Sequence, residues 1–242
     1  LAGAIAGHLM LKLGVDPYAA IAVALLIGIG VGMFNGYLIA YVGIPSFIVT
    51  LGGLTLWRGL AFESTGGFDN SGLPDPFPFI GYGEILGIPM PILIMLLAYV
   101  VMAFVLSSTR FGRHVYAIGS NAAGARQVGI NIRRSTMGVY VVSGFVCALA
   151  AIVLMARMDS SSGRMAMNFE LDAIAAVILG GTSLFGGRGS IWGSLLGAIL
   201  ITMIRNGMNL LEISQFQQMM AIGAVVILAV WIDVIRRKRM LR

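Results

Sequence analysis

The chain has 242 residues, of which 58% are hydrophobic and only 11% charged, and its mean hydropathy is +0.93. This composition excludes an ordinary soluble globular domain and predicts an integral membrane protein. Sixteen Lys and Arg against ten Asp and Glu give a formal charge of +6, and in a membrane protein such a basic excess indicates topology rather than nucleic-acid binding.

The apolar runs begin with residues 1–11, which are fewer than the roughly 20 that a helix needs to cross the hydrocarbon core. We expect this run to be the remainder of a cut helix in an N-terminally truncated sequence. The continuous later runs exclude transmembrane β-strands, in which polar and apolar residues alternate, and predict an all-α, polytopic helical bundle. Five of them are long enough to cross: Tyr18 to Val42, Met90 to Ser107, Thr136 to Arg157, Ile191 to Leu210 and Phe216 to Ile235.

Two shorter runs, Phe47 to Phe62 and Leu171 to Gly187, are richer in glycine and threonine. Each contains the pattern V-x-L-G-G-x-x-L-aromatic followed by Arg-Gly, at 49–59 and 177–189. If both runs cross the membrane, the two copies point in opposite directions, as in an inverted repeat that flanks a transport pathway. Chance recurrence or close packing of small residues would also produce this pattern.

The basic residues predict the orientation. The segment from Ser108 to Ser135 holds five arginines, the tail after Ile235 holds four arginines and a lysine, and neither holds an acid. Both segments, and therefore the C-terminus, are expected to be cytoplasmic. With both short runs counted as crossings, nine of the ten acids lie on the outer side, whereas a single re-entrant run would put the two basic segments on opposite sides.

Residues 63–89 are rich in Gly, Pro and Asn and are expected to form an outer loop built of turns. Two interpretations are open for this loop, an ordered surface that receives something from outside and a solvated connector. Uncharged polar groups and glycines near the two Leu-Gly-Gly segments are the candidates to line a transport pathway, because irregular backbone is tolerated at membrane depth where it lines a cavity. These candidates are Asn35, Thr50, Gly53, Thr55, Gly181, Thr182 and Ser183.

Other membrane-protein chemistries lack their usual groups. An ion-coupled carrier generally needs an ionisable side chain inside the bilayer, and Arg205 is the exception here, compatible with facing the bundle interior or with snorkelling to the interface. The two histidines and single cysteine suit neither a metal site nor a nucleophile with its base. We therefore expect no catalytic residues, metal or cofactor, and the energy for transport should come from another chain.

A short helix is predicted within the basic segment, with Ser120 or Asn121 as its N-cap and Gly129 closing it with φ > 0. Two turns are fewer than the ~12–15 residues at which an isolated helix is marginal in water, so this helix needs a surface. Ala122 and Ala123 would allow close approach to a partner protein, and Arg126 could pair with a partner acid. The alternative is that the helix rests on its own bundle or on lipid headgroups.

Three stretches of the sequence closely resemble the permease subunits of bacterial ABC monosaccharide importers of the ribose/xylose type. They are PSFIVTLG at 45–52, YAIGSNAAGARQVGIN at 116–131 and ELDAIAAVILGGTSLFGGRGS at 170–190. The resemblance implies a multi-pass permease of the bacterial inner membrane that is not itself an enzyme. The implied partners are a cytoplasmic ABC ATPase, a periplasmic binding protein that delivers the sugar, a second identical or related permease and the lipid membrane, with no nucleic acid.

The resemblance also implies that 108–135 is the coupling loop that docks into the ATPase. The docking residues are then Asn121, Ala122, Ala123, Arg126, Gly129 and Ile130. On the outer side, Glu170 and Asp172 are the candidates for docking. The sugar is left open among pentoses, hexoses and a furanose-like signalling molecule, and the alternative function is an ion-coupled secondary solute transporter.

Overall fold

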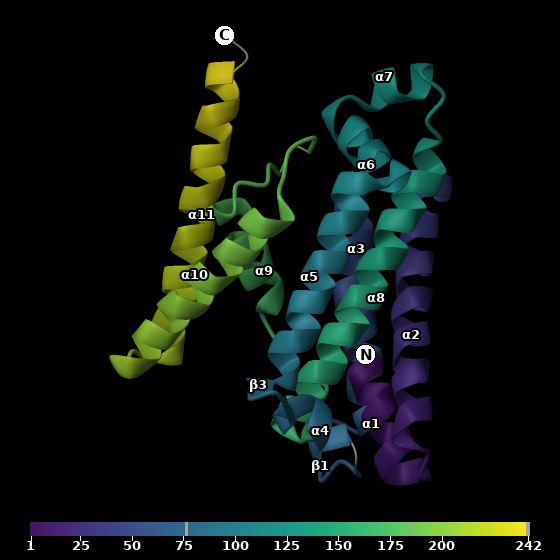
Figure 1. Cartoon of the computed structure of the whole chain (residues 1–242), viewed down its shortest axis with the longest axis vertical. Helices are drawn as coiled ribbons and strands as arrows, with labels where there is room; N and C mark the ends of the chain where they lie inside the picture. The colour runs from purple at the N-terminus through teal and green to yellow at the C-terminus, as the bar shows by residue number, and fades with distance from the viewer. Residues whose placement is uncertain (76, 185, 241–242) are drawn as a thin grey trace. The chain divides into compact units, whose positions relative to one another are not determined.

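The computed structural model describes residues 1–75, 77–184 and 186–240, and these are mainly helical (Figure 1). Among them, five helices are long and apolar enough to cross a membrane. They are α2 (Pro17–Tyr37, continued by the π-helix η1, Leu38–Val42), α5 (Met90–Ser108), α8 (Ile132–Met158), α10 (Ile191–Leu210) and α11 (Gln215–Met240). The five predicted spans and the all-α, polytopic class are thereby confirmed.

The other helices are shorter or less apolar. They are α1 (Ala2–Leu13), α3 (Ser46–Thr65), α4 (Phe77–Tyr82), α6 (Arg110–Ser120), α7 (Ala122–Gln127) and α9 (Phe169–Leu179). Within the described residues, two antiparallel pairs of two-residue strands join β1 (Asn70–Ser71) to β4 (Ser160–Ser161) and β2 (Glu84–Ile85) to β3 (Ile88–Pro89). The chain divides into unit 1, residues 1–98 and 131–165, and unit 2, residues 99–130 and those from Ala166 onward.

In unit 1, α2 packs antiparallel against α8 through a stripe of small residues. A Cβ at Gly28 would lie 2.5 Å from the Cβ of Ala148, and a Cβ at Gly36 would lie 2.8 Å from the Sδ of Met137. Small residues at every fourth position let two membrane helices approach this closely. The buried positions of α2 follow that spacing: Ala20, Ala24, Gly28, Gly32 and Gly36.

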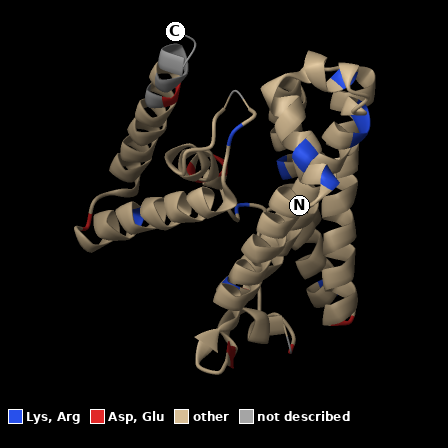
Figure 2. Cartoon of the chain, turned by 45° about the horizontal axis from the view of Figure 1, so that its top comes forward, with Lys and Arg blue, Asp and Glu red and all other residues tan. Residues whose placement is uncertain are grey.

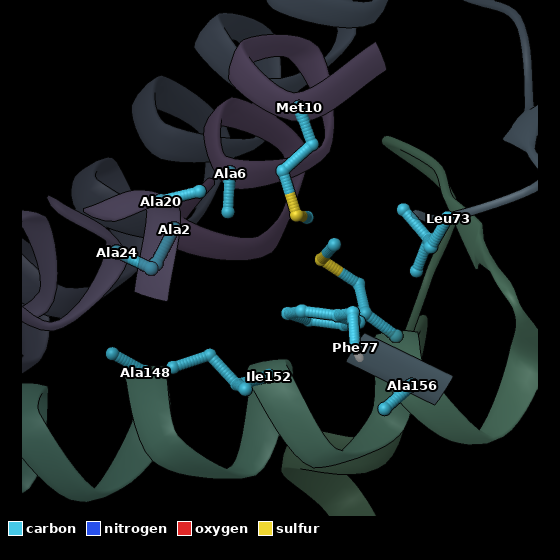
Figure 3. Packing of buried hydrophobic residues seen from close by; sticks show 11 residues of the cluster. Ala2, Ala6, Met10, Ala20, Ala24, Leu73, Phe77, Ala148, Ile152 and Ala156 are labelled. Carbon is cyan, nitrogen blue, oxygen red and sulfur yellow. The ribbon is translucent and has the colours of Figure 1, made fainter. Parts of the chain in front are cut away.

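The described residues of segment 63–89 pack against the rest of unit 1. Leu73 and Phe77 are buried with Met10 and Ile152 in the core of unit 1 (Figure 3). Strand β1 pairs with β4, and the backbone N–H of Leu73 donates to Oδ1 of Asp159 over 3.0 Å. The segment therefore closes one end of unit 1 as a packed cap.

The acids of unit 1 lie at one of its ends, whereas its basic residues lie at both (Figure 2). The end where α2 begins and α8 finishes carries acids, from Asp16 to Asp159, together with basic residues such as Lys12. The opposite end carries Arg133 and Arg134 and no described acid of unit 1.

Helix α9 covers only the first part of the apolar run from Leu171 to Gly187. Helix α9 ends at Leu179 after 11 residues, which at 1.5 Å per residue cover about half of a hydrocarbon core. Gly181 and Gly187 have φ of +84° and +77°, values that glycine adopts without steric cost. Phe47 to Phe62, by contrast, lies within the continuous 20-residue α3, whose glycines do not interrupt it.

Helix α9 packs on α10 and α11 in unit 2. Ala175 and Ala176 of α9 are buried with Ile201 of α10 and Ile222 of α11. A Cβ at Gly180 would lie 2.7 Å from the backbone nitrogen of Ser194, so the end of α9 rests directly on the first turn of α10. This contact fixes where the loop between the two helices starts.

Candidate functional site

A cavity of about 250 Å³ lies in unit 1 between α1, α2, α3 and α8. Its wall is mostly apolar, and none of the described side chains that line it is charged. The polar groups of the wall belong to Asn35, Trp57, Tyr140, Ser143 and Cys147. A mostly apolar cavity with a few placed polar groups is the usual composition of a small-molecule site.

Two polar atoms in this cavity are buried and have no hydrogen-bond partner among the described residues, the acceptor Oδ1 of Asn35 and the donor Nε1 of Trp57. Gly53 lies beside both, because a Cβ there would be 3.1 Å from Nε1 and 3.5 Å from Oδ1. Phe34 holds the indole edge-on, with ring centroids 5.4 Å apart. Since an unsatisfied buried polar group costs about 1–3 kcal/mol, a ligand that accepts from Trp57 and donates to Asn35 would be favoured.

The structure brings only some of the predicted unit 1 residues to this cavity. Asn35 lines it and Gly53 adjoins it, whereas Thr50 and Thr55 do not line it. Their hydroxyls donate to carbonyls of their own helix, those of Ser46 and Gly52, over 2.9 Å each. Sequence reasoning missed Trp57, although it is the aromatic position of the repeated pattern.

The predicted residues of unit 2 lie in the loop after α9, and two of them make hydrogen bonds there. The hydroxyl of Ser183 and the backbone N–H of Leu184 both donate to Oδ2 of Asp233 in α11, over 3.3 Å. The backbone N–H of Thr182 donates to the carbonyl of Val177 over 3.1 Å. Exposed Gly181 precedes them with its positive φ, so these groups hold the loop against α11.

Helix α7 has the predicted cap and closure. Oδ1 of Asn121 accepts from the backbone N–H of Gly124 over 2.9 Å, and Gly129 has φ +81°. The backbone N–H of Ile130 closes the turn by donating to the carbonyl of Ala125 over 3.0 Å. The helix itself ends at Gln127, one residue earlier than expected.

One face of α7 is covered and another is open. Ala125 is buried, whereas Ala122, Ala123 and Arg126 are exposed, and Val128 beyond the helix is 77% exposed. The described part of unit 2 therefore leaves a surface of small residues with one arginine uncovered.

Segment 108–135, expected to hold one short helix in a loop, contains a second helix. Helix α6 precedes α7 and is capped by Thr109, whose hydroxyl accepts from the backbone N–H of Gly112 over 3.3 Å. The second half of α6 touches the loop after α9, because the Tyr116 hydroxyl donates to the carbonyl of Gly189 over 3.0 Å. A Cβ at Gly119 would lie 2.5 Å from the backbone nitrogen of Gly187.

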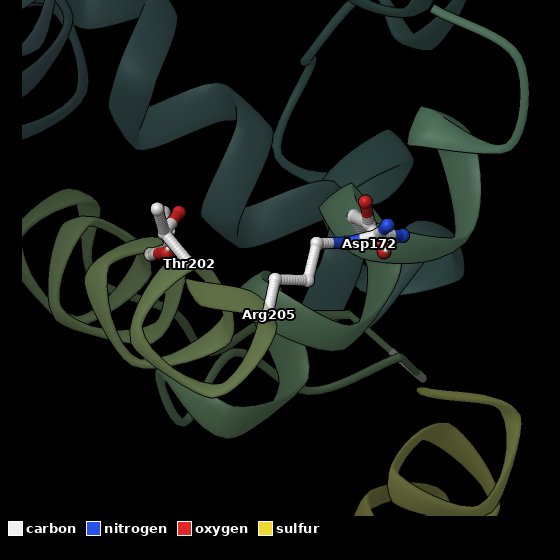
Figure 4. A network of polar contacts seen from close by, with 4 residues as sticks. Asp172, Thr202 and Arg205 are labelled. Atoms are coloured by element: carbon white, nitrogen blue, oxygen red, sulfur yellow. Dashed lines mark hydrogen bonds and ion pairs between the residues drawn. The ribbon is translucent and has the colours of Figure 1, made fainter. Parts of the chain in front are cut away.

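Arg205 is paired with an acid. Its Nη2 donates to Oδ1 of Asp172 over 2.7 Å, with the side chains 33% and 17% exposed (Figure 4). Asp172, expected on the outer docking surface, is thus engaged within unit 2, while Glu170 is exposed. The sequence identified the arginine as unusual but contained no signal for its partner 33 residues earlier.

Comparison with known proteins gives one family and several relatives. The family described as branched-chain amino acid transport system / permease component matches residues 1–230. The ribose import permease protein RbsC of Haemophilus influenzae is 40% identical over 240 residues, 96% of this chain and 73% of the relative. RbsC of Bacillus subtilis is 43% identical over 226 residues, 93% and 70% of the two chains.

A further relative is the D-allose transport system permease protein AlsC of Escherichia coli. It is 35% identical over 236 residues, which are 96% of this chain and 72% of the relative. No solved structure matches the chain significantly. The resemblance stated from the sequence motifs is confirmed by these relatives.

Proposed function

Since the chain belongs to the family of branched-chain amino acid transport system permease components, and relatives 35–43% identical to it are named as ribose and D-allose permeases, we propose that it is the transmembrane permease subunit of an ATP-driven monosaccharide importer. The sugar would be delivered from the outer side by a periplasmic binding protein. The chain forms the path, and a separate ATPase subunit hydrolyses ATP.

The unit 1 cavity is the observation that favours a sugar as cargo. It offers one donor and one acceptor without partners, and a sugar hydroxyl both donates and accepts. A zwitterionic amino acid has an ammonium and a carboxylate to neutralise, and no charged side chain among the described residues lines this cavity. An ion-coupled carrier, the alternative function, also needs an ionisable group in its site.

Helix α7 is the proposed contact with the ATPase. Its exposed face carries Ala122, Ala123 and Arg126, and the flanking cap of Asn121 and closure by Gly129 keep it helical. A displacement of α7 would reach the loop after α9 through the α6–α7 junction and then α11 through Asp233. Along the chain, α7 is followed directly by α8, which lines the cavity.

The proposed orientation in the bacterial inner membrane places α7 and the basic C-terminal tail in the cytoplasm. Glu170 and the packed cap at 63–89 then lie outside, where the binding protein would dock, and a second identical or related permease would complete the assembly. The test is a Ser120→Cys variant made in a Cys147→Ser background. A membrane-impermeant maleimide should not label position 120 in intact cells, and labelling there would reverse the orientation.

Reconstitution tests the function itself. The permease would be purified with the ATPase and binding protein encoded beside it, and ATP hydrolysis and uptake would be measured in lipid vesicles with ribose, xylose, allose and leucine. A sugar should stimulate hydrolysis and enter only with ATP. Stimulation by leucine alone, or uptake driven by an ion gradient without the ATPase, would overturn the proposal.

A further inference from the structure

A polar stripe runs along one face of α10 in unit 2. Thr202, Arg205, Asn206 and Asn209 follow the three- and four-residue spacing that places side chains on one side of a helix. Together with Met203 they line an open hollow of about 360 Å³. Because α10 is a candidate membrane span, such a face is unstable against lipid and is expected to meet protein or a water-filled space.

The charged pair at this stripe leaves hydrogen-bonding capacity unused. Arg205 donates from Nη2 to Asp172, while its buried Nε has no partner among the described residues (Figure 4). A guanidinium has five N–H donors and a carboxylate accepts at two oxygens. The pair is neutral overall, so neither an anion nor a cation is the ligand that it favours.

The neighbouring amides are held in place from α11. Gln218, only 7% exposed, donates from Nε2 to Oδ1 of Asn209 over 2.8 Å and to the carbonyl of Ile213 over 2.9 Å. Because Oδ1 of Asn209 accepts this bond, its NH₂ group is the part available for another partner. Asn206, which follows Arg205 directly in the sequence and is exposed, adds a second amide.

We propose that this hollow, lined by Thr202, Arg205, Asn206 and Asn209, is a second binding site for a neutral polyhydroxylated ligand on the transport pathway, with Asp172 acting through its ion pair with Arg205. The inference rests on the proposed function and adds to the unit 1 cavity a site with a different chemistry. Guanidinium, carboxylate and amide groups together both donate to and accept from sugar hydroxyls.

Asn206→Leu is the main test, in ATP-driven uptake of radiolabelled D-ribose by the reconstituted complex. The KM for ribose should rise about tenfold, as expected for the loss of a hydrogen bond to ligand, and Asn206→Gln should recover part of it. Gln217→Leu, which removes an exposed amide outside the hollow, is the control and should keep the wild-type KM. An unchanged KM in Asn206→Leu would overturn the inference.

A charge swap separates binding from a merely structural ion pair. The double variant Asp172→Arg/Arg205→Asp should reach the membrane in normal amounts but keep a raised KM, because the donors and acceptor have exchanged places. Restoration of the wild-type KM would overturn the role of the pair in binding. A disulfide between two copies of Asn206→Cys, in a Cys147→Ser background, would assign the hollow to a permease–permease contact and also contradict the inference.

Uptake measurements in the same vesicles distinguish failure of the proposed importer function from failure of the second binding site. If the wild-type complex shows no ATP-dependent ribose uptake and no stimulation by other sugars, the proposed function fails. If the wild-type complex transports ribose and the Asn206→Leu complex matches it at every concentration, only the second site fails.

Discussion

The two Leu-Gly-Gly segments share a sequence pattern but not a conformation. In unit 1 the segment lies inside α3, where Gly53 is helical and buried beside Trp57. In unit 2 the same pattern ends α9, and Gly181 takes φ +84°. The residues that follow decide the difference, because Leu-Thr-Leu-Trp continues a helix, whereas the second copy is soon followed by further glycines with positive φ, Gly186 and Gly187.

The two segments therefore have different structural roles in the two units. A glycine inside a helix leaves space for a ligand next to two polar atoms without partners. A glycine at a helix end starts a loop whose polar groups bind α6 and α11. The repeated pattern thus identifies two segments as candidates for a functional role, but it does not predict that they share a conformation or a role.

The largest expected effect is at the first segment. Gly53→Leu should reduce sugar uptake by about tenfold or more, because the side chain would occupy the space beside Asn35 and Trp57 at an overpacking cost of about 1–3 kcal/mol. Gly52→Leu is the matched control, since a Cβ at Gly52 meets nothing within 4 Å. Uptake would be compared at equal amounts of membrane-inserted protein, and normal uptake by Gly53→Leu would remove the cavity from the pathway.

The second prediction concerns the docking helix. Ala123→Asp should prevent co-purification of the ATPase because it buries an unpaired charge in a close contact, and Gly129→Val should do so because a β-branched residue is disfavoured at φ +81°. Arg126→Ala should be milder, since an exposed ion pair contributes under about 1 kcal/mol. Wild-type pull-down and uptake for both Ala123→Asp and Gly129→Val would show that α7 is not the docking element.

The sequence predicts the structure correctly at the positions where local chemistry determines it. Five spans, the Asn121 cap and the closure at Gly129 follow from hydrophobic length, capping and positive φ. The end of α9 at Leu179 does not follow from hydrophobicity, because the apolar run continues past it and the glycines after it set the backbone.

The site could be predicted only in part. Asn35 was identified as an uncharged polar group near the repeat, but its convergence with Trp57 and Tyr140 depends on how α2, α3 and α8 pack. The pairing of Arg205 with Asp172 and the contact of Tyr116 with Gly189 join residues far apart in the sequence. No local pattern encodes such contacts, although the four-residue spacing of small residues in α2 was a readable signal for its packing on α8.

A pair of alanine substitutions sharpens the comparison of the two segments. Gly52→Ala should stabilise the protein by about 0.5–1 kcal/mol, because alanine is favoured inside a helix and the added Cβ is unobstructed. Gly181→Ala should destabilise it by about 1–2 kcal/mol, because its φ of +84° is unfavourable for a residue with a Cβ. Unfolding in detergent would measure both, and shifts of the same sign would contradict the assigned conformations.

The smallest predicted effect is at the contact between α6 and the loop after α9. Tyr116→Phe removes one hydrogen bond, to the carbonyl of Gly189, which contributes about 0.5–1.5 kcal/mol. Sugar transported per ATP hydrolysed should fall modestly while the ATPase stays bound. If the amount of sugar transported per ATP hydrolysed is unchanged, the contact between Tyr116 and Gly189 does not transmit a displacement of α7.

The most direct measurement of the unit 1 pathway uses Cys147, the only cysteine in the sequence, which lines the cavity. In the complete complex, with partner subunits freed of cysteine, N-ethylmaleimide should modify Cys147 and stop ATP-driven ribose uptake, and ribose should slow the modification. Cys147→Ser should make uptake resistant to the reagent. If Cys147 is modified at the same rate with and without ribose, and uptake continues after modification, the sugar does not pass through this cavity.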